Sequence, residues 1–206
     1  METGASERGW RGSADVWLDA AYQVLIESGV GQVKVMTLAE RLGLSRTSFY
    51  WHFADREALL AGLIARWQGR NTGNLVARCE APAASTTEAI LNVFDCWIDP
   101  ALFDSALEFA MRTWALTDPA LAATLAAEDA VRIAALASLF RRFGYDQDEA
   151  DIRAHTVYLT QVGYIAMRAT ESVERRIARI PAYALTFTGR APTEAEVSAF
   201  RARHIG

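Results

Sequence analysis

Residues 37–53, with the sequence TLAERLGLSRTSFYWHF, constrain the fold more than any other stretch of the chain. The segment TLAERLG has the apolar spacing of a short helix. Its inward face would carry Leu38, Ala39 and Leu42. Gly43 suits the left-handed turn after such a helix, Leu44 can fill the corner, and Ser45 is a preferred N-cap for a second short helix. Two short helices joined by a tight glycine turn predict a helix-turn-helix.

The second short helix explains why the ring side chains FYWHF follow it at once. A helix advances about 100° per residue, so Arg46, Thr47 and Tyr50 share one face while Phe49 points toward the core. In helix-turn-helix proteins this helix enters the major groove of DNA. Arg46 can pair with guanine, Thr47 can contact a thymine methyl group, and Tyr50 can reach a base or a phosphate.

Residues beyond this helix extend the predicted DNA surface. Trp51 and His52 follow its end and can donate to phosphates, although simple packing at the helix end is an equal alternative for His52. Arg56 stands in the first turn of the next helix, where that helix's N-terminus also favours a phosphate. The expected DNA contacts are therefore Arg46, Thr47, Ser48, Tyr50, Trp51, His52 and Arg56.

The rest of the chain favours an all-α fold, since Ala and Leu dominate, Pro is rare and no strand pattern occurs. Helices are expected from residue 14 to the ESGVGQ sequence and at about 55–78, 87–98, 101–116, 120–143, 147–170 and 193–204. Thr193 and Glu196 have the spacing of a capping box for the last helix. Residues 172–188, which include Pro181, show a weaker pattern.

The expected organisation is an N-terminal three-helix domain followed by a C-terminal helical bundle. The ranges are a disordered arm at residues 1–12, a helix-turn-helix domain at 13–60 with a connecting helix at about 55–78, and a helical domain at 80–206. The small, polar sequence EAPAASTT at 80–87 marks a domain boundary or a helix–helix link.

The sequence MTLAERLGLSRTSFYWHFADREALLAGLI resembles the N-terminal domain of the TetR (tetracycline repressor-like) family of bacterial transcription regulators. The matching features are the Leu-Ala pair at 38–39, the Gly-Leu-Ser corner at 43–45, the aromatic run at 49–53 and Arg-Glu-x-Leu-Leu at 56–60. The match covers residues 14–66. It implies the same DNA contacts as the residue-by-residue interpretation above.

Two positions depart from the family pattern. Lys34 stands where the second helix of the family often has a Ser or Thr cap, which would weaken the start of that helix. Met36 stands where a polar or basic residue often precedes the Leu-Ala pair, so a base contact from this helix is not expected.

The resemblance implies that the later residues form a ligand-sensing and dimerisation domain. Aromatic and apolar residues there, with a few polar ones, fit a pocket between helices, although each is also an ordinary core residue type. The candidate pocket residues are Trp97, Phe103, Met111, Trp114, His155, Tyr158 and Tyr164. A stripe on helix 147–170 could form a two-fold dimer interface or pack within the chain. Its candidate interface residues are Ala154, Val157, Gln161 and Ile165.

The expected function is that of a dimeric repressor that binds a palindromic, double-stranded DNA operator and is released by an unknown small, largely apolar effector. An enzyme is disfavoured, because the three His residues form no catalytic motif and Asp151–His155 is only a helical pair. A helical adaptor that has lost DNA binding stays open, since residues 1–70 carry 8 Lys or Arg against 8 Asp or Glu.

The remaining expectations concern location and cofactors. No window of about 18 apolar residues and no apolar leader occur, so we expect a cytoplasmic protein without membrane association. Cys79 and Cys96 lack metal-ligand spacing and are expected to be buried thiols. No metal or other cofactor is expected.

Overall fold

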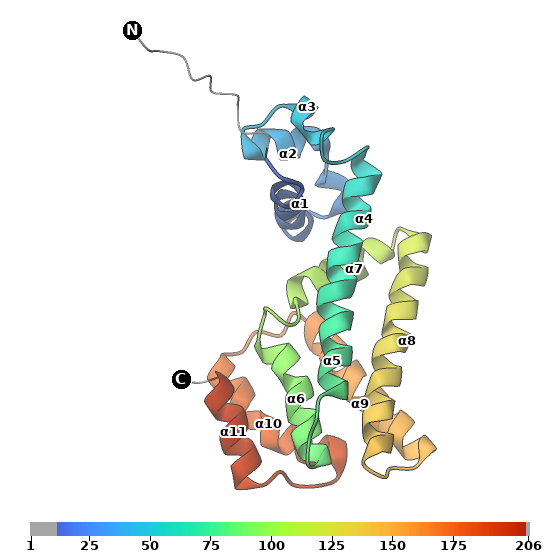
Figure 1. The fold of residues 1–206 in the computed structure, drawn as a ribbon, viewed down its shortest axis with the longest axis vertical. Helices are drawn as coiled ribbons and strands as arrows, with labels where there is room; N and C mark the ends of the chain where they lie inside the picture. The colour runs from blue at the N-terminus through green and yellow to red at the C-terminus, as the bar shows by residue number, and fades with distance from the viewer. Residues whose placement is uncertain (1–11, 205–206) are drawn as a thin grey trace. The chain divides into compact units, whose positions relative to one another are not determined.

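The computed structural model describes residues 12–204, which form helices joined by short links and contain no strand (Figure 1). The all-α prediction is confirmed for these residues. The predicted arm at residues 1–12 lies outside them except for Gly12. The chain divides into two units between Arg66 and Trp67, so the second unit begins earlier than the predicted residue 80. Residues 80–87 instead link two helices of that unit.

The first unit is a small helical domain built around two buried aromatic side chains. Its elements are α1 (Ala14–Ser28), the 3-10 turn η1 (Val30–Gln32), α2 (Val35–Leu42), α3 (Arg46–Phe49) and α4 (Arg56–Trp67) as far as Arg66. Trp17 and Phe49 are fully buried, and their rings meet edge to face with centroids 5.3 Å apart. A Cβ at Gly62 would lie 2.9 Å from Leu18, so glycine permits the close approach of α4 to α1.

The predicted corner between α2 and α3 is confirmed. Gly43 has φ 64° and ψ 28°, the left-handed conformation that glycine adopts without steric cost. The Leu44 amide donates to the carbonyl of Ala39 (3.0 Å), which satisfies one of the last carbonyls of α2. The Ser45 hydroxyl accepts from the amide of Ser48 (3.2 Å) and so caps α3. Lys34 makes no side-chain cap at the start of α2.

The second unit is a helical bundle. Its elements are the π-helical turn η2 (Gln68–Gly73), α5 (Asn74–Glu80), α6 (Thr86–Ile98), α7 (Ser105–Ala115), α8 (Pro119–Arg142), α9 (Gln147–Ala166), α10 (Val173–Thr188) and α11 (Glu194–His204). The helix α8 packs along α9 and also contacts α5 and α7, whereas α10 and α11 both pack on α6 (Figure 1). Most of the buried apolar side chains of the unit belong to one continuous core.

Three elements differ from the sequence prediction. The predicted helix at 55–78 is interrupted by η2, which turns Asn71 and Thr72 into the interior, where both bind polar side chains. The helix α7 begins later than expected because Asp104 caps it, accepting from the amide of Leu107 (2.9 Å). Residues 173–188 form a full helix despite Pro181, since its apolar face is buried. The capping box of Thr193 and Glu196 is confirmed.

Candidate nucleic-acid interface and ligand cavity

The short helix α3 presents a polar outer face that is held from behind by one aromatic side chain. Arg46 and Thr47 are exposed, and Tyr50 and Trp51 are 54% and 66% exposed. Phe49 is fully buried and packs against Trp17, Phe53 and the edge of the Tyr50 ring, with centroids 5.2 to 5.5 Å apart. The buried ring therefore fixes how the exposed side chains of α3 are directed.

Three of the seven predicted DNA contacts occupy other roles in the structure. Ser48 is 5% exposed, and its hydroxyl donates to the carbonyl of Ser45 (2.6 Å), so it serves the helix cap. Arg56 donates through Nε to the carbonyl of Val33 (2.6 Å) and through Nη2 to that of Val30 (2.8 Å). It therefore fastens α4 to η1, and the two backbone carbonyls occupy two of its five N–H donors.

His52 is half-buried, and its Nε2 is covered and finds no partner among the described residues. This geometry favours packing at the end of α3 over a phosphate contact. Met36 is 56% exposed, and its thioether offers no hydrogen-bond donor to a base. The structure thus leaves Arg46, Thr47, Tyr50 and Trp51 as the exposed members of the predicted set.

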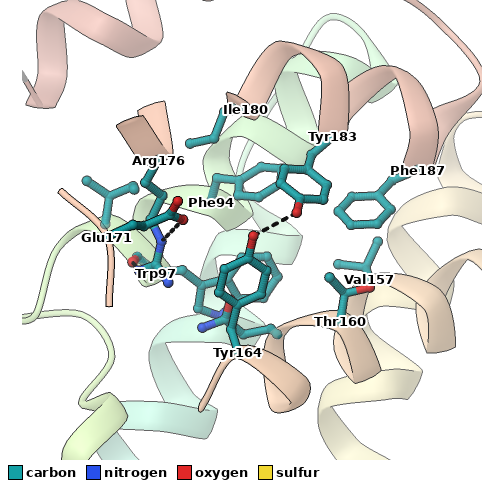
Figure 2. Close-up of a pocket in the computed structure, with 12 residues that line it drawn as sticks. Phe94, Trp97, Val157, Thr160, Tyr164, Glu171, Arg176, Ile180, Tyr183 and Phe187 are labelled. Carbon is teal, nitrogen blue, oxygen red and sulfur yellow. Dashed lines mark hydrogen bonds and ion pairs between the residues drawn. The ribbon is translucent and has the colours of Figure 1, made fainter. Parts of the chain in front are cut away.

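The second unit holds a small cavity between α6, α9 and α10, with a volume of about 30 Å³ (Figure 2). Aromatic side chains make most of its wall. The residues that line it are Phe94, Trp97, Ile98, Val157, Thr160, Gln161, Tyr164, Glu171, Arg176, Ile180, Tyr183 and Phe187. A volume of this size accommodates about one water molecule.

Among the fully covered side-chain nitrogen and oxygen atoms of this cavity, all but one are paired. The hydroxyls of Tyr164 and Tyr183 share a hydrogen bond of 2.7 Å that joins α9 to α10 (Figure 2). This hydrogen bond raises the pKa of Tyr183. Glu171 lies 3.6 Å from Arg176, whose Nη1 donates to the backbone carbonyl of Trp97 (2.9 Å). The exception is Trp97 Nε1, which is buried and finds no acceptor among the described residues.

A second polar cluster, the Glu108 network, lies in the interior of the same unit. Glu108 and Arg132 have no exposed surface and are joined by an Nη1–Oε1 contact of 2.8 Å. Glu108 also accepts from Asn71 (2.9 Å), Trp67 (2.6 Å) and Arg112 (3.0 Å). The network thus draws together η2, α7 and α8, which are far apart in the sequence.

Electrostatics keep Glu108 ionised in this interior. Burial by itself would raise the pKa of its carboxyl group, but the charges of Arg132 and Arg112 and the hydrogen bonds from Arg132 and Asn71 outweigh it, so the pKa is lowered. Tyr158 closes the network, accepting from Arg132 (2.9 Å) and donating to Asp129 (2.6 Å), and burial raises its pKa.

Comparison with known proteins finds a family match in the N-terminal part of the chain. Residues 18–63 match the family model of "Bacterial regulatory proteins, tetR family". This segment includes the α2–α3 corner, Phe49 and the start of α4. The N-terminal unit therefore resembles the tetR family over this segment, which is about a fifth of the chain.

The named relatives agree with this assignment. The tetracycline repressor protein class A from transposon 1721 of Escherichia coli is 38% identical over 61 residues, which are 30% of this chain and 28% of the repressor. Two solved structures share the fold over nearly the whole chain. GusR of Salmonella enterica has a TM-score of 0.62 at 20% identity and covers 93% of this chain and 94% of its own. The fatty acid degradation regulator FadR of Bacillus halodurans has a TM-score of 0.65 at 16% identity and covers 91% and 100%.

The names of these relatives describe one as a repressor and another as a fatty acid degradation regulator. Across residues 12–204, none of the helices combines the length and apolar character needed to cross a membrane.

The second unit places the predicted pocket residues in different surroundings. Trp97 and Tyr164 line the cavity. Phe103, Met111 and Trp114 are buried elsewhere, Tyr158 belongs to the Glu108 network, and His155 lies at the surface of α9 beside Asp151. The cavity residues that sequence reasoning missed are chiefly on α10, namely Glu171 before it and Arg176, Ile180, Tyr183 and Phe187 within it. The helical spacing of these residues could have identified them in the sequence, but Pro181 within the segment made the helical pattern look weak.

The predicted dimer residues require correction. Ala154, Val157, Gln161 and Ile165 are each less than 9% exposed within a single chain, so none is available to a partner. Val157 and Gln161 line the cavity instead. The stripe on α9 is therefore its inward face, because the bundle packs on it. The outer face carries Ile152 and Leu159, which are 66% and 58% exposed.

Proposed function

We propose that this protein is a TetR-like transcriptional repressor that binds a palindromic DNA operator as a homodimer and is released by a small, largely apolar molecule. The observation that carries the proposal is the exposed Arg46–Thr47–Tyr50 face of α3, supported from behind by the buried Phe49. Exposed Arg and Thr side chains on a helix of this kind suit base edges in the major groove. A dimer would present two such helices to the two halves of a palindrome.

The release mechanism is a shift between two states of the dimer. One state would place the two α3 helices at the spacing of the operator, and the effector would bind the other state more tightly. Moving the population from 1:99 to 99:1 requires about 5.5 kcal/mol of preference for one state. A molecule that binds both states equally would leave operator affinity unchanged.

Selection of duplexes from a random pool, followed by binding at two salt concentrations, tests DNA reading. We expect enrichment of a palindrome whose affinity falls steeply as salt rises, because Arg contacts to phosphates release counterions. Arg46→Ala should weaken the enriched site by about 1–3 kcal/mol, or about 5- to 150-fold. Arg66→Ala is the matched control, since Arg66 lies in the last turn of α4 and pairs with Asp19 at 2.6 Å. An absence of enrichment would favour the adaptor alternative.

The outer faces of α9 and α10 are the proposed dimer surface. Ile152, Leu159 and Leu185 are exposed there, and both helices line one surface groove that includes Ile152 and Thr186. A second copy of the chain is the expected occupant, because a palindromic operator requires a two-fold axis.

Leu159→Arg should weaken self-association about 100-fold or more, since it would bury an unpaired charge at the interface. Sedimentation equilibrium measures this shift. Leu116→Arg is the control, because Leu116 is 83% exposed at the end of α7, away from that surface. A Leu159→Arg protein that stays dimeric would exclude this face.

A further inference from the structure

The cavity between α6, α9 and α10 has walls suited to a flat ring. Phe94 and Phe187 stack with centroids 6.1 Å apart, and Phe187 and Tyr183 stack at 5.5 Å. Trp97 meets Phe94 edge to face at 5.3 Å. Figure 2 shows Phe94, Tyr183 and Phe187 gathered in the upper part of the cavity wall, with Trp97 and Tyr164 below them. Aromatic side chains arranged in this way offer both faces and edges to another ring.

One polar group in this wall lacks a partner. Trp97 is 6% exposed, and its Nε1 is fully covered without an acceptor among the described residues. An indole N–H only donates, so it is satisfied only by a molecule that brings an acceptor. Buried donors are rarely left unpaired, because their desolvation is not compensated.

The charges at the cavity are already balanced. Glu171 pairs with Arg176 at 3.6 Å and with Arg179 at 2.9 Å, and Arg176 also lies over the ring of Tyr164. Arg179 is not among the lining residues, so the cavity wall itself carries one charge of each sign. A charged ligand would lose its hydration without gaining a counter-ion, which disfavours it.

A ring needs more room than about 30 Å³, and the surrounding backbone has two features that allow it. Arg168 has φ 50°, a left-handed conformation that is unfavourable for a residue with a Cβ, in the link before α10. Pro181 lacks an N–H, so the helical carbonyl four residues earlier loses its donor, and the helix bends there more readily. The segment between them carries Arg176 and Ile180 of the cavity wall.

We propose that the effector is a neutral, flat aromatic molecule with one hydrogen-bond acceptor, which enters the cavity between α6, α9 and α10 and accepts from Trp97 Nε1. Entry separates Tyr164 from Tyr183 and displaces the segment before Pro181, which carries Arg176 and Ile180 of the cavity wall. This inference rests on the proposed function, because only a regulator has an effector. The binding of the molecule is nevertheless measured without DNA.

Four probes of matched shape test the ligand class. Acetophenone has the ring and the acceptor, α-methylstyrene replaces its oxygen with CH₂, benzoate adds charge, and cyclohexyl methyl ketone removes the aromatic ring. Each is titrated into the full-length protein labelled with ¹⁵N-tryptophan, and the indole N–H signal of Trp97 is assigned with Trp97→Phe. We expect acetophenone to shift that signal downfield in a saturable way and to bind about tenfold or more tighter than the other three.

Two variants test whether Trp97 Nε1 causes the difference in affinity between the probes. Trp97→Phe keeps a ring but removes the donor, so acetophenone and α-methylstyrene should then bind equally. Trp114→Phe is the matched control, since Trp114 Nε1 already donates to Asp118 (3.1 Å) and does not line the cavity. The wild-type comparison of probes decides the question even where Trp97→Phe fails to fold. The inference is overturned if acetophenone leaves the Trp97 signal unmoved, if α-methylstyrene binds equally well, or if benzoate binds more tightly.

Operator release is then measured separately by adding acetophenone to the protein–operator complex. Release would support both proposals. Binding at Trp97 without release would overturn the role of this cavity as the effector site, while leaving DNA reading intact. Failure to select any operator would instead count against the proposed function alone, because the indole measurement needs no DNA.

Discussion

Glu108→Ala is expected to lower the free energy of unfolding by about 3–5 kcal/mol. The substitution removes the carboxylate that faces Arg132, and the Arg132 guanidinium has no exposed surface from which water could replace it. Asn71 and the Trp67 indole would lose an acceptor at the same time. Equilibrium unfolding in urea, followed by far-UV circular dichroism, measures the change.

A matched control separates burial from the mere loss of an ion pair. Glu149 pairs with Arg153 at 2.7 Å in the same unit, but its side chain is 45% exposed. Glu149→Ala should therefore change stability by only about 0–1 kcal/mol. A Glu108→Ala protein that lost less than its control would show that Arg132 is not held by Glu108, and the account of the interior would fail.

Phe49→Ala is expected to cost about 3–5 kcal/mol and to abolish operator binding. Phe49 is fully buried, and its ring meets that of Trp17 edge to face with centroids 5.3 Å apart. Without it the four residues of α3 would lose their anchor, and so short a helix does not persist alone. Thermal unfolding and operator binding of the same sample report the two effects.

Tyr50→Ala is the comparison that gives this result meaning. Tyr50 follows Phe49 in sequence but is 54% exposed, so its loss should change stability by less than about 1 kcal/mol while weakening operator binding. Equal destabilisation by Phe49→Ala and Tyr50→Ala would contradict the arrangement in which one residue anchors the helix and the next faces the DNA.

The sequence alone determined the features that arise between neighbouring residues. Gly43 and Ser45 specified the corner and the cap of α3, and Thr193 with Glu196 specified the start of α11. The inward direction of Phe49 followed from the helical period. These features were predictable because a cap, a left-handed turn and a helical face depend on side chains only a few positions apart.

Only the tertiary structure decided which of several similar residues face the interior and which side chains they contact there. Nothing local shows that Arg56 would bind the carbonyls of η1, or that Val157 and Gln161 would face a cavity and not a partner chain. The same holds for Glu108 and Arg132, which meet across 24 positions of the chain. Such contacts depend on how helices distant in sequence pack together. An apolar stripe on a helix predicts that this face is buried, but it does not predict which element covers it.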